Sequence, residues 1–333
     1  MTITTNIKVL KCLMAIRLDV NIWSARKKLI PSDFGATELP PEKLASLGSK
    51  KICNPKELCI FGTLKSRAIS LLDKNGVRFL GGWALPEQKV EEIQNTLLEI
   101  AADFNDAKEL FLNRYDESVQ EWIRNNPGWE SLIASSAVSS DYVRSRLDFN
   151  WQMFKIMPPS KKNEAVSSGL QGEVENLGVT LFGEVAKIAT DSWHNSFAGK
   201  DNVTRKALAP LRSVHRKLSG LSFIEPRVSP VITLLETAFS KIPAKGRIRG
   251  ANLIMLQGLL CLLRDPSALV EHGQKIIEGN TPDKVLQNLL SNQDTAHGPQ
   301  VESASFANEQ IDDLPESVAI PAQPAPLNSL GLW

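Results

Sequence analysis

The sequence lacks an apolar run of the length that a membrane helix needs. The best candidate, residues 251–263, is short and is interrupted by Asn252, Gln257 and Gly258, whereas a membrane span takes about 20 predominantly apolar residues. The first residues also lack the basic, apolar and small-residue regions of a secretory signal. We therefore expect a cytoplasmic protein that does not act at a membrane.

Cysteine and histidine are both scarce, with four of each in 333 residues. Cys53 and Cys59 are the closest pair of cysteines, but the five residues between them exceed the spacing of zinc sites. The histidines are scattered, and none has a second histidine within a helical turn to share a metal ion. The sequence thus predicts reduced thiols and no metal site.

The common catalytic motifs are absent as well. The sequence contains no P-loop, no dinucleotide-binding glycine motif, no paired-histidine zinc motif and no nucleophile elbow. Acid pairs such as Glu91 and Glu92 are adjacent on a predicted helix, so the two carboxylates cannot face each other across a substrate. We predict no catalytic residue, no cofactor and no enzyme activity.

Three short stretches are predicted to be strands. Residues 16–22 and 147–153 alternate between apolar and polar side chains, the period of a strand with one buried face. Residues 77–83 form a third, weaker candidate because the glycine pair at 81–82 gives a strand little to pack. Asn54, followed by a proline and then a glutamate, indicates a helix start, which predicts a helix over residues 55–73.

Two long helices carry the clearest apolar pattern. Along residues 86–122, apolar positions recur at alternating spacings of three and four over roughly three heptads, and residues 170–197 also show helical spacing. Because a heptad stripe must be covered by a partner helix, we expect these two helices to pack against each other. Shorter helices are predicted over residues 203–218, 229–240, 251–264, 267–278 and 282–291.

Together these elements predict a mainly α protein with a small β-sheet, an α+β fold. Long antiparallel helices would pack on about three strands and be followed by a helical C-terminal half and a disordered tail. We divide the chain into an α+β region at residues 1–198, a basic helical region at 199–291 and a disordered acidic tail at 292–333.

The charge is balanced overall, at +1, but it is distributed unevenly. Residues 200–250 hold eleven basic residues and three acids, whereas residues 87–121 hold ten acids and three basic residues. The pattern of residues 241–250 predicts a flexible basic loop suited to phosphate contacts, and a second basic cluster follows the first strand. These candidate contacts to nucleic acid or to an acidic partner are Arg26, Lys27, Lys28, Lys241, Lys245, Arg247 and Arg249. The alternative for both clusters is a solvated surface.

The tail differs from the rest of the chain in composition. Residues 292–333 contain six acids, five prolines and no lysine or arginine, a composition that cannot offset the entropy of ordering. The tail ends on apolar side chains, Leu330, Leu332 and Trp333, which are candidates for docking into a partner groove. The alternative is an untethered terminus, or a segment that folds back on the basic loop.

Several short segments carry a family resemblance: residues 22–29, 47–51, 81–83, 127–129 and 151–154. In these segments the chain resembles the domain of unknown function 3150 family, over most of residues 6–290. The resemblance implies an origin in a phage, plasmid or integrative element. It also implies a partnership with a MoxR-like AAA+ ATPase or a von Willebrand A-type protein, and it transfers no functional residue.

Two functions remain after these exclusions. The first is a non-catalytic interaction or scaffold protein in a multiprotein assembly, in which the long helices and the tail recruit a protein partner. The second is a nucleic-acid-associated protein that uses the basic patches. A third hypothesis, an enzyme with an unfamiliar active site, is not supported by any residue that we identified in the sequence.

Overall fold

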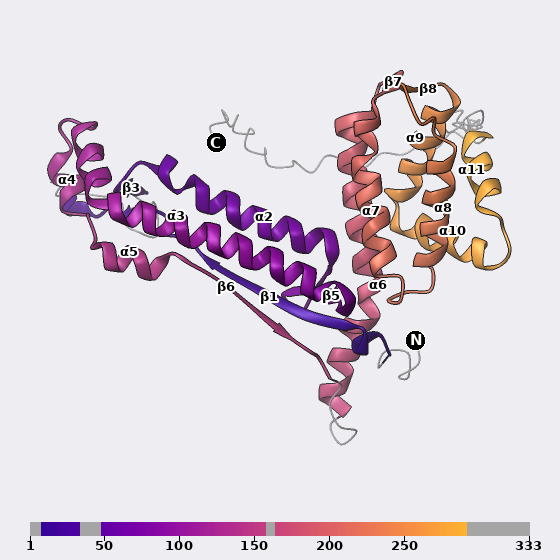
Figure 1. Cartoon of the computed structure of the whole chain (residues 1–333), viewed down its shortest axis with the longest axis horizontal. Coiled ribbons are helices and arrows are strands. Elements are labelled where there is room, and N and C mark those ends of the chain that lie inside the picture. Colours follow the sequence, from indigo (N-terminus) through magenta and orange to yellow (C-terminus); the bar gives the residue numbers. More distant parts are fainter. Residues whose placement is uncertain (1–7, 34–47, 158–163, 292–333) are drawn as a thin grey trace, which may run out of the picture. The chain divides into compact units, whose positions relative to one another are not determined.

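The computed structural model describes residues 8–33, 48–157 and 164–291, which belong to one compact unit (Figure 1). They form a mainly helical fold with one small antiparallel sheet. The predicted fold class, mainly α with a small β-sheet, is confirmed. Predictions about residues 292–333 lie outside the described residues.

The sheet has four strands in the order β4-β5-β1-β6. They are β4 (Val77–Phe79), β5 (Gly82–Pro86), β1 (Leu13–Asn21) and β6 (Asp148–Phe154). The central strand β1 pairs antiparallel with β5, with Ile16 opposite Trp83, and with β6, with Leu18 opposite Trp151. The three predicted strand segments are therefore all in the sheet, and the middle one opens into a hairpin.

The two glycines at 81–82, which made residues 77–83 a weaker strand candidate in the sequence, have different structural roles. Leu80 and Gly81 form the two-residue turn, with φ angles of 48° and 74°, and positive φ at both positions is what a type I′ hairpin turn requires. Gly82 then lies directly against β1. A Cβ atom there would be 2.2 Å from the carbonyl oxygen of Ile16, so only glycine lets β5 approach β1.

The helices α2 (Cys59–Asn75) and α3 (Val90–Arg124) lie side by side and run antiparallel (Figure 1). The Asn54 side chain caps a 3-10 turn, Pro55–Leu58, that leads into α2, and a second 3-10 turn, Glu87–Lys89, leads into α3. Both helices bury one face against Ile16, Trp83 and Phe149 of the sheet. Their side chains in this first cluster include Phe61, Leu64, Ala68, Leu72, Ile93, Leu97, Ile100 and Phe104.

The second long helix, α6 (Glu164–Ser192), extends into a π-helical turn at Trp193–Phe197. It packs on β4 and on the C-terminal helices, so the prediction that it covers the seam of α3 was wrong. That seam is covered by α2. Heptad spacing identifies a buried stripe but does not identify its partner, and both α2 and α6 have a suitable face.

The C-terminal helices form a second hydrophobic cluster around α6. They are α7 (Ala209–Gly220), preceded by the 3-10 turn Arg205–Leu208, α8 (Val228–Ser240), α9 (Ala251–Leu263), α10 (Pro266–Ile277) and α11 (Pro282–Ser291). Val77, Phe79 and Ala84 of the β4–β5 hairpin belong to this cluster, whereas Trp83 and Leu85 belong to the first one. The hairpin therefore lies between the two clusters.

A buried ion pair joins α7 to α6 and α2. The Lys217 ammonium donates to the carboxylate of Glu184 at 2.5 Å and to the backbone carbonyl of Asp73 at 2.6 Å. The other carboxylate oxygen of Glu184 accepts from the backbone N–H of Arg78 at 3.0 Å. The Lys217 side chain is only 3% exposed and that of Glu184 is 23% exposed, so the ammonium is buried while the carboxylate is partly open to water.

Several short elements were not predicted. The connector after α3 contains α4 (Glu130–Ala134) and α5 (Ser140–Arg146). Two short ladders pair β2 (Arg26–Lys28) with β3 (Ser49–Lys51) and β7 (Asn202–Val203) with β8 (Ile248–Arg249). A 3-10 turn, Pro31–Asp33, follows β2.

Among the described residues, no single helix has both the length and the apolar character to cross a membrane. Within this part of the chain, α9 and α10 have the necessary length and apolar character only when they are taken together, and the pair is bent at the break between them.

Candidate functional site

The first basic cluster of the sequence lies on a strand. Arg26, Lys27 and Lys28 form β2, which pairs antiparallel with β3, so that Arg26 lies opposite Lys51 and Lys27 opposite Lys50. We call this β2–β3 ladder the ribbon. It brings together five cationic side chains, of which the sequence analysis named three.

The register of the ribbon sorts its charges onto two faces, because paired residues share a face and neighbours alternate. Lys27 and Lys50 share one face with Asp33, which holds Lys50 at 2.6 Å. The hydrogen bond from Lys50 lowers the pKa of Asp33, so this pair is lost only as the pH falls through that lowered pKa. The other face carries Arg26, Lys28 and Lys51, all exposed. Its charge is therefore available to an anionic partner.

The ribbon is anchored to the first hydrophobic cluster at one end. Ala25 is fully buried with a positive φ of 52°, a conformation that L-residues seldom adopt. Its carbonyl oxygen accepts from the backbone N–H of Ile52 at 2.9 Å. Beside it, burial raises the pKa of the Cys53 thiol to about 12. Cys53 is therefore a neutral, shielded thiol, and its protection from alkylation reports whether the ribbon is anchored.

The second basic segment, residues 241–250, is held more firmly than the flexible loop that we predicted. Lys241 pairs with Asp283 at 2.6 Å, and Arg247 donates to the side chain of Asn202 at 2.7 Å. Arg205 donates to the carbonyl oxygen of Pro243, and Arg249 lies on β8, opposite Asn202. These contacts tie the segment to the residues before α7 and to α11.

The same contacts gather cations from two parts of the chain. We call the exposed group Lys200, Lys206, Lys245, Arg247 and Arg249 the loop surface. A cavity of about 300 Å³ lies there, lined in part by Lys200, Lys206 and Thr204. Lys241 is neutralised by Asp283, so of the four candidates in this segment, three contribute free charge.

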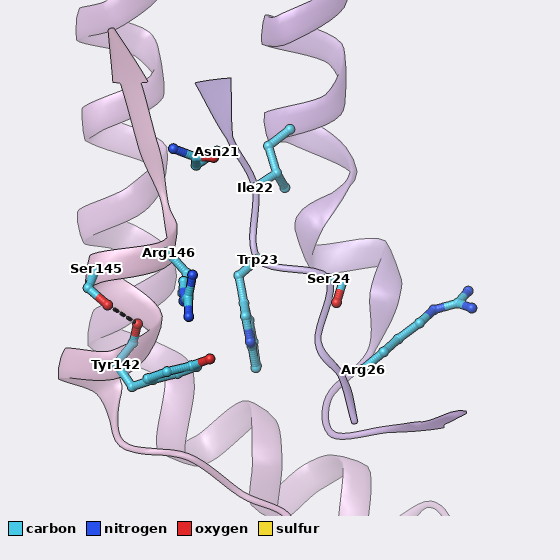
Figure 2. A pocket seen from close by; sticks show the side chains of 8 residues that line it. All are labelled: Asn21, Ile22, Trp23, Ser24, Arg26, Tyr142, Ser145 and Arg146. Atoms are coloured by element: carbon cyan, nitrogen blue, oxygen red, sulfur yellow. Dashed lines mark hydrogen bonds between the residues drawn. The ribbon is translucent and has the colours of Figure 1, made fainter. Parts of the chain in front are cut away.

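A recess of about 330 Å³ lies next to the ribbon, between the end of β1 and α5 (Figure 2). Trp23 forms one wall and is 7% exposed, because its ring packs on Tyr115 with ring centroids 5.6 Å apart. Tyr142 and Arg146 reach toward Trp23 from α5, whereas the Arg26 side chain extends away from them (Figure 2). The remaining lining residues are Asn21, Ile22, Ser24 and Ser145.

Sequence reasoning missed this recess. Trp23 and Arg26 are more than a hundred residues away from Tyr142 and Arg146, and the composition around α5 predicts only a polar connector. The available signal was the spacing of Tyr142 and Arg146, four residues apart, which places both on one face of a helix.

The acidic charge of α3 is partly compensated by neighbouring elements. Asp103 pairs with Arg67 at 3.0 Å, and Glu109 pairs with Arg144. The acids that remain exposed on α3 are Glu91, Glu92, Glu99, Asp106, Asp116, Glu117 and Glu121. They make no ion pair among the described residues, so they leave a negative helix face.

The other predicted sites lie elsewhere or are not described. Leu330, Leu332 and Trp333, the candidate docking residues of the tail, fall outside the described residues. Within residues 8–33, 48–157 and 164–291, no group of three or more histidine, cysteine or acidic side chains is placed to hold a metal ion.

The chain is similar to one family of proteins over most of its length. The model of a family described as "Protein of unknown function (DUF3150)" matches residues 10–265, which includes the ribbon, the recess and the loop surface. No curated protein and no solved structure matches the chain.

Proposed function

We propose that this chain, which belongs to the DUF3150 family, is a cytoplasmic, non-catalytic interaction protein that binds nucleic acid through the ribbon and the loop surface. One observation carries the proposal. The backbone of Arg26–Lys28 lies in one two-stranded ladder, and the second basic segment is tied down by the ladder at Ile248–Arg249 and by the contacts of Lys241, Pro243 and Arg247. The backbone that carries these cations is therefore fixed before any partner arrives.

A fixed backbone that carries several cations suits a polyanion for a physical reason. Binding to the phosphate backbone gains free energy mainly by releasing condensed counterions, and a segment whose backbone is already positioned loses less entropy when it binds. On the ribbon, the Cα atoms of Arg26 and Lys28 are about 7 Å apart along one strand. The Cβ atom of Lys51 lies about 5 Å from that of Arg26 on the opposite strand. Three cationic side chains that start at this spacing can reach successive phosphates.

Removing either surface should weaken binding and its salt dependence together. For the combined variant Arg26→Ala, Lys28→Ala and Lys51→Ala, we expect the slope of log affinity against log salt to fall by about 2. The same change is expected for Lys245→Ala, Arg247→Ala and Arg249→Ala. Fluorescence anisotropy with labelled DNA and RNA across a salt series measures both quantities.

A matched control removes the same charge elsewhere. Lys74, Lys187 and Arg212 are exposed and lie on α2, α6 and α7, so their combined alanine variant should bind almost as the unmodified chain does. If affinity does not depend on salt, or if the control loses as much as the ribbon variant, the proposal is wrong. Tighter binding of polyglutamate than of DNA would assign the surfaces to an acidic protein instead.

A second candidate function concerns a protein partner, and the exposed acids of α3 favour it. A basic surface of another protein would find seven uncompensated carboxylates along one helix, which steer association electrostatically. The family resemblance suggests a MoxR-like AAA+ ATPase in a phage or mobile element as that partner. The chain would then connect nucleic acid to a multiprotein assembly.

Neutralising part of the α3 face tests this second function. The variant Glu99→Gln and Asp106→Asn should lose co-elution with such an ATPase in size-exclusion chromatography. The control variant Glu173→Gln and Asp191→Asn, which removes two exposed acids from α6, should keep it. Equal co-elution of the two variants, or none with the unmodified chain, would count against an α3 interface.

A further inference from the structure

We infer that the recess between Trp23 and α5 takes an unstacked base, so that the nucleic acid bound by the ribbon is single-stranded. The inference rests on the proposed function and adds the class of nucleic acid. It is carried by the arrangement of Tyr142 and Arg146 over a polar recess that continues onto the ribbon.

The helix α5 is fixed firmly enough to position these side chains. The Ser139 hydroxyl accepts from the backbone N–H of Tyr142 at 3.3 Å and caps the helix. Val143 and Leu147 are fully buried against the first cluster. Arg144 is bound by both carboxylate oxygens of Glu109 on α3. With its other faces tied down, α5 directs Tyr142 and Arg146 into the recess.

The lining has the chemistry that a nucleotide needs. Tyr142 is 43% exposed, and the Arg146 guanidinium carbon lies 5.2 Å from the centroid of the Tyr142 ring. An exposed aromatic ring stacks on any base, and a nearby guanidinium binds phosphate. Asn21, Ser24 and Ser145 offer polar groups to base edges, and no acid is among the lining residues. The volume of about 330 Å³ lies at the lower end of the range for small-ligand sites.

Arg26 lies at the edge of the recess, and its side chain extends away from Tyr142 and Arg146 (Figure 2). It also lies opposite Lys51 in the ladder, so a strand whose phosphates follow Arg26, Lys28 and Lys51 passes the edge of the recess. A base can enter only if it is free of its neighbours, and duplex bases are paired and stacked. A single strand supplies unstacked bases at no such cost, whereas a duplex would meet only the ribbon.

The experiment compares single-stranded and duplex DNA of the same sequence and length, about 20 nucleotides, by anisotropy at fixed salt. The unmodified chain should prefer the single strand. Tyr142→Ala should weaken single-strand binding by about tenfold and leave duplex affinity within about twofold, while Tyr142→Phe retains the preference. Arg146→Ala should lower the single-strand salt slope by about 0.7.

Two controls separate the effect of the recess from misfolding and from the loss of an exposed aromatic side chain elsewhere. Trp129 is another exposed aromatic residue, 54% exposed and outside the recess, so Trp129→Ala should change nothing. Cys53 should remain shielded from alkylation in Tyr142→Ala if the fold is intact. Equal affinity of the unmodified chain for both DNA forms, with no effect of Tyr142→Ala, overturns this inference and leaves the proposed function standing. If the unmodified chain binds neither DNA form and also fails to bind RNA, the proposed function itself is overturned.

Discussion

The variant Gly82→Ala is expected to lose about 3 kcal/mol or more of unfolding free energy. The new Cβ would lie 2.2 Å from the carbonyl oxygen of Ile16 and 3.1 Å from its carbonyl carbon. Both atoms belong to the backbone of the central strand β1, so no side-chain rotation relieves the clash. Urea denaturation followed by circular dichroism measures the loss.

Two other glycines make the comparison specific. Gly81 has a φ of 74° and open space around its Cα, so Gly81→Ala should cost about 1 kcal/mol through backbone strain alone. Gly62 lies exposed on α2, and a methyl group added to its Cα would meet open space, so Gly62→Ala should raise stability by about 0.5–1 kcal/mol. If Gly82→Ala is no worse than Gly81→Ala, the close approach of β5 to β1 does not have the importance that we assign to it.

The second large effect is expected at the buried ion pair. Lys217→Met removes the cation and leaves the carboxylate of Glu184 and the carbonyl of Asp73 without their partner. Breaking a buried pair from one side costs about 3–5 kcal/mol. We expect roughly 3 kcal/mol, the low end of that range, because Glu184 is 23% exposed and water can reach it.

A double-mutant cycle identifies the cause of this loss. Glu184→Gln keeps an oxygen for the N–H of Arg78 but removes the charge, so the double variant with Lys217→Met should be less destabilised than the sum of the two single variants. Lys187→Met, at an exposed position on α6, controls for the loss of a lysine and should change stability by less than about 0.5 kcal/mol. Strict additivity in the cycle would show that the two charges do not interact.

The elements with strong periodicity were predictable from the sequence. The alternation of residues 16–22 identified β1, and the heptad pattern of residues 86–122 identified α3, each within a few residues of its observed bounds. Which elements pack together was not predictable, because the stripe on α3 can be covered by any helix with a suitable face. The ribbon was also missed. Its strands are three residues each and carry mainly charged side chains, so they have no hydrophobic period to detect.

Part of the candidate site was predictable, because charged side chains can be read directly from a sequence. Arg26, Lys28, Lys245, Arg247 and Arg249 were all named in this way. Which charges are already neutralised depends on long-range contacts, such as Lys241 with Asp283 and Lys50 with Asp33. The recess needs Tyr142 beside Trp23, a juxtaposition that only the packing of α5 on α3 creates.

The position of the β4–β5 hairpin between the two hydrophobic clusters has a consequence for how this protein loses its structure. Trp83 and Leu85 pack into one cluster while Val77, Phe79 and Ala84 pack into the other. Neither cluster can melt without exposing apolar surface of the same hairpin, and that exposure carries the free-energy cost of hydrating it. We therefore expect the two halves of the described fold to stabilise each other through this hairpin, so that loss of either cluster weakens the other.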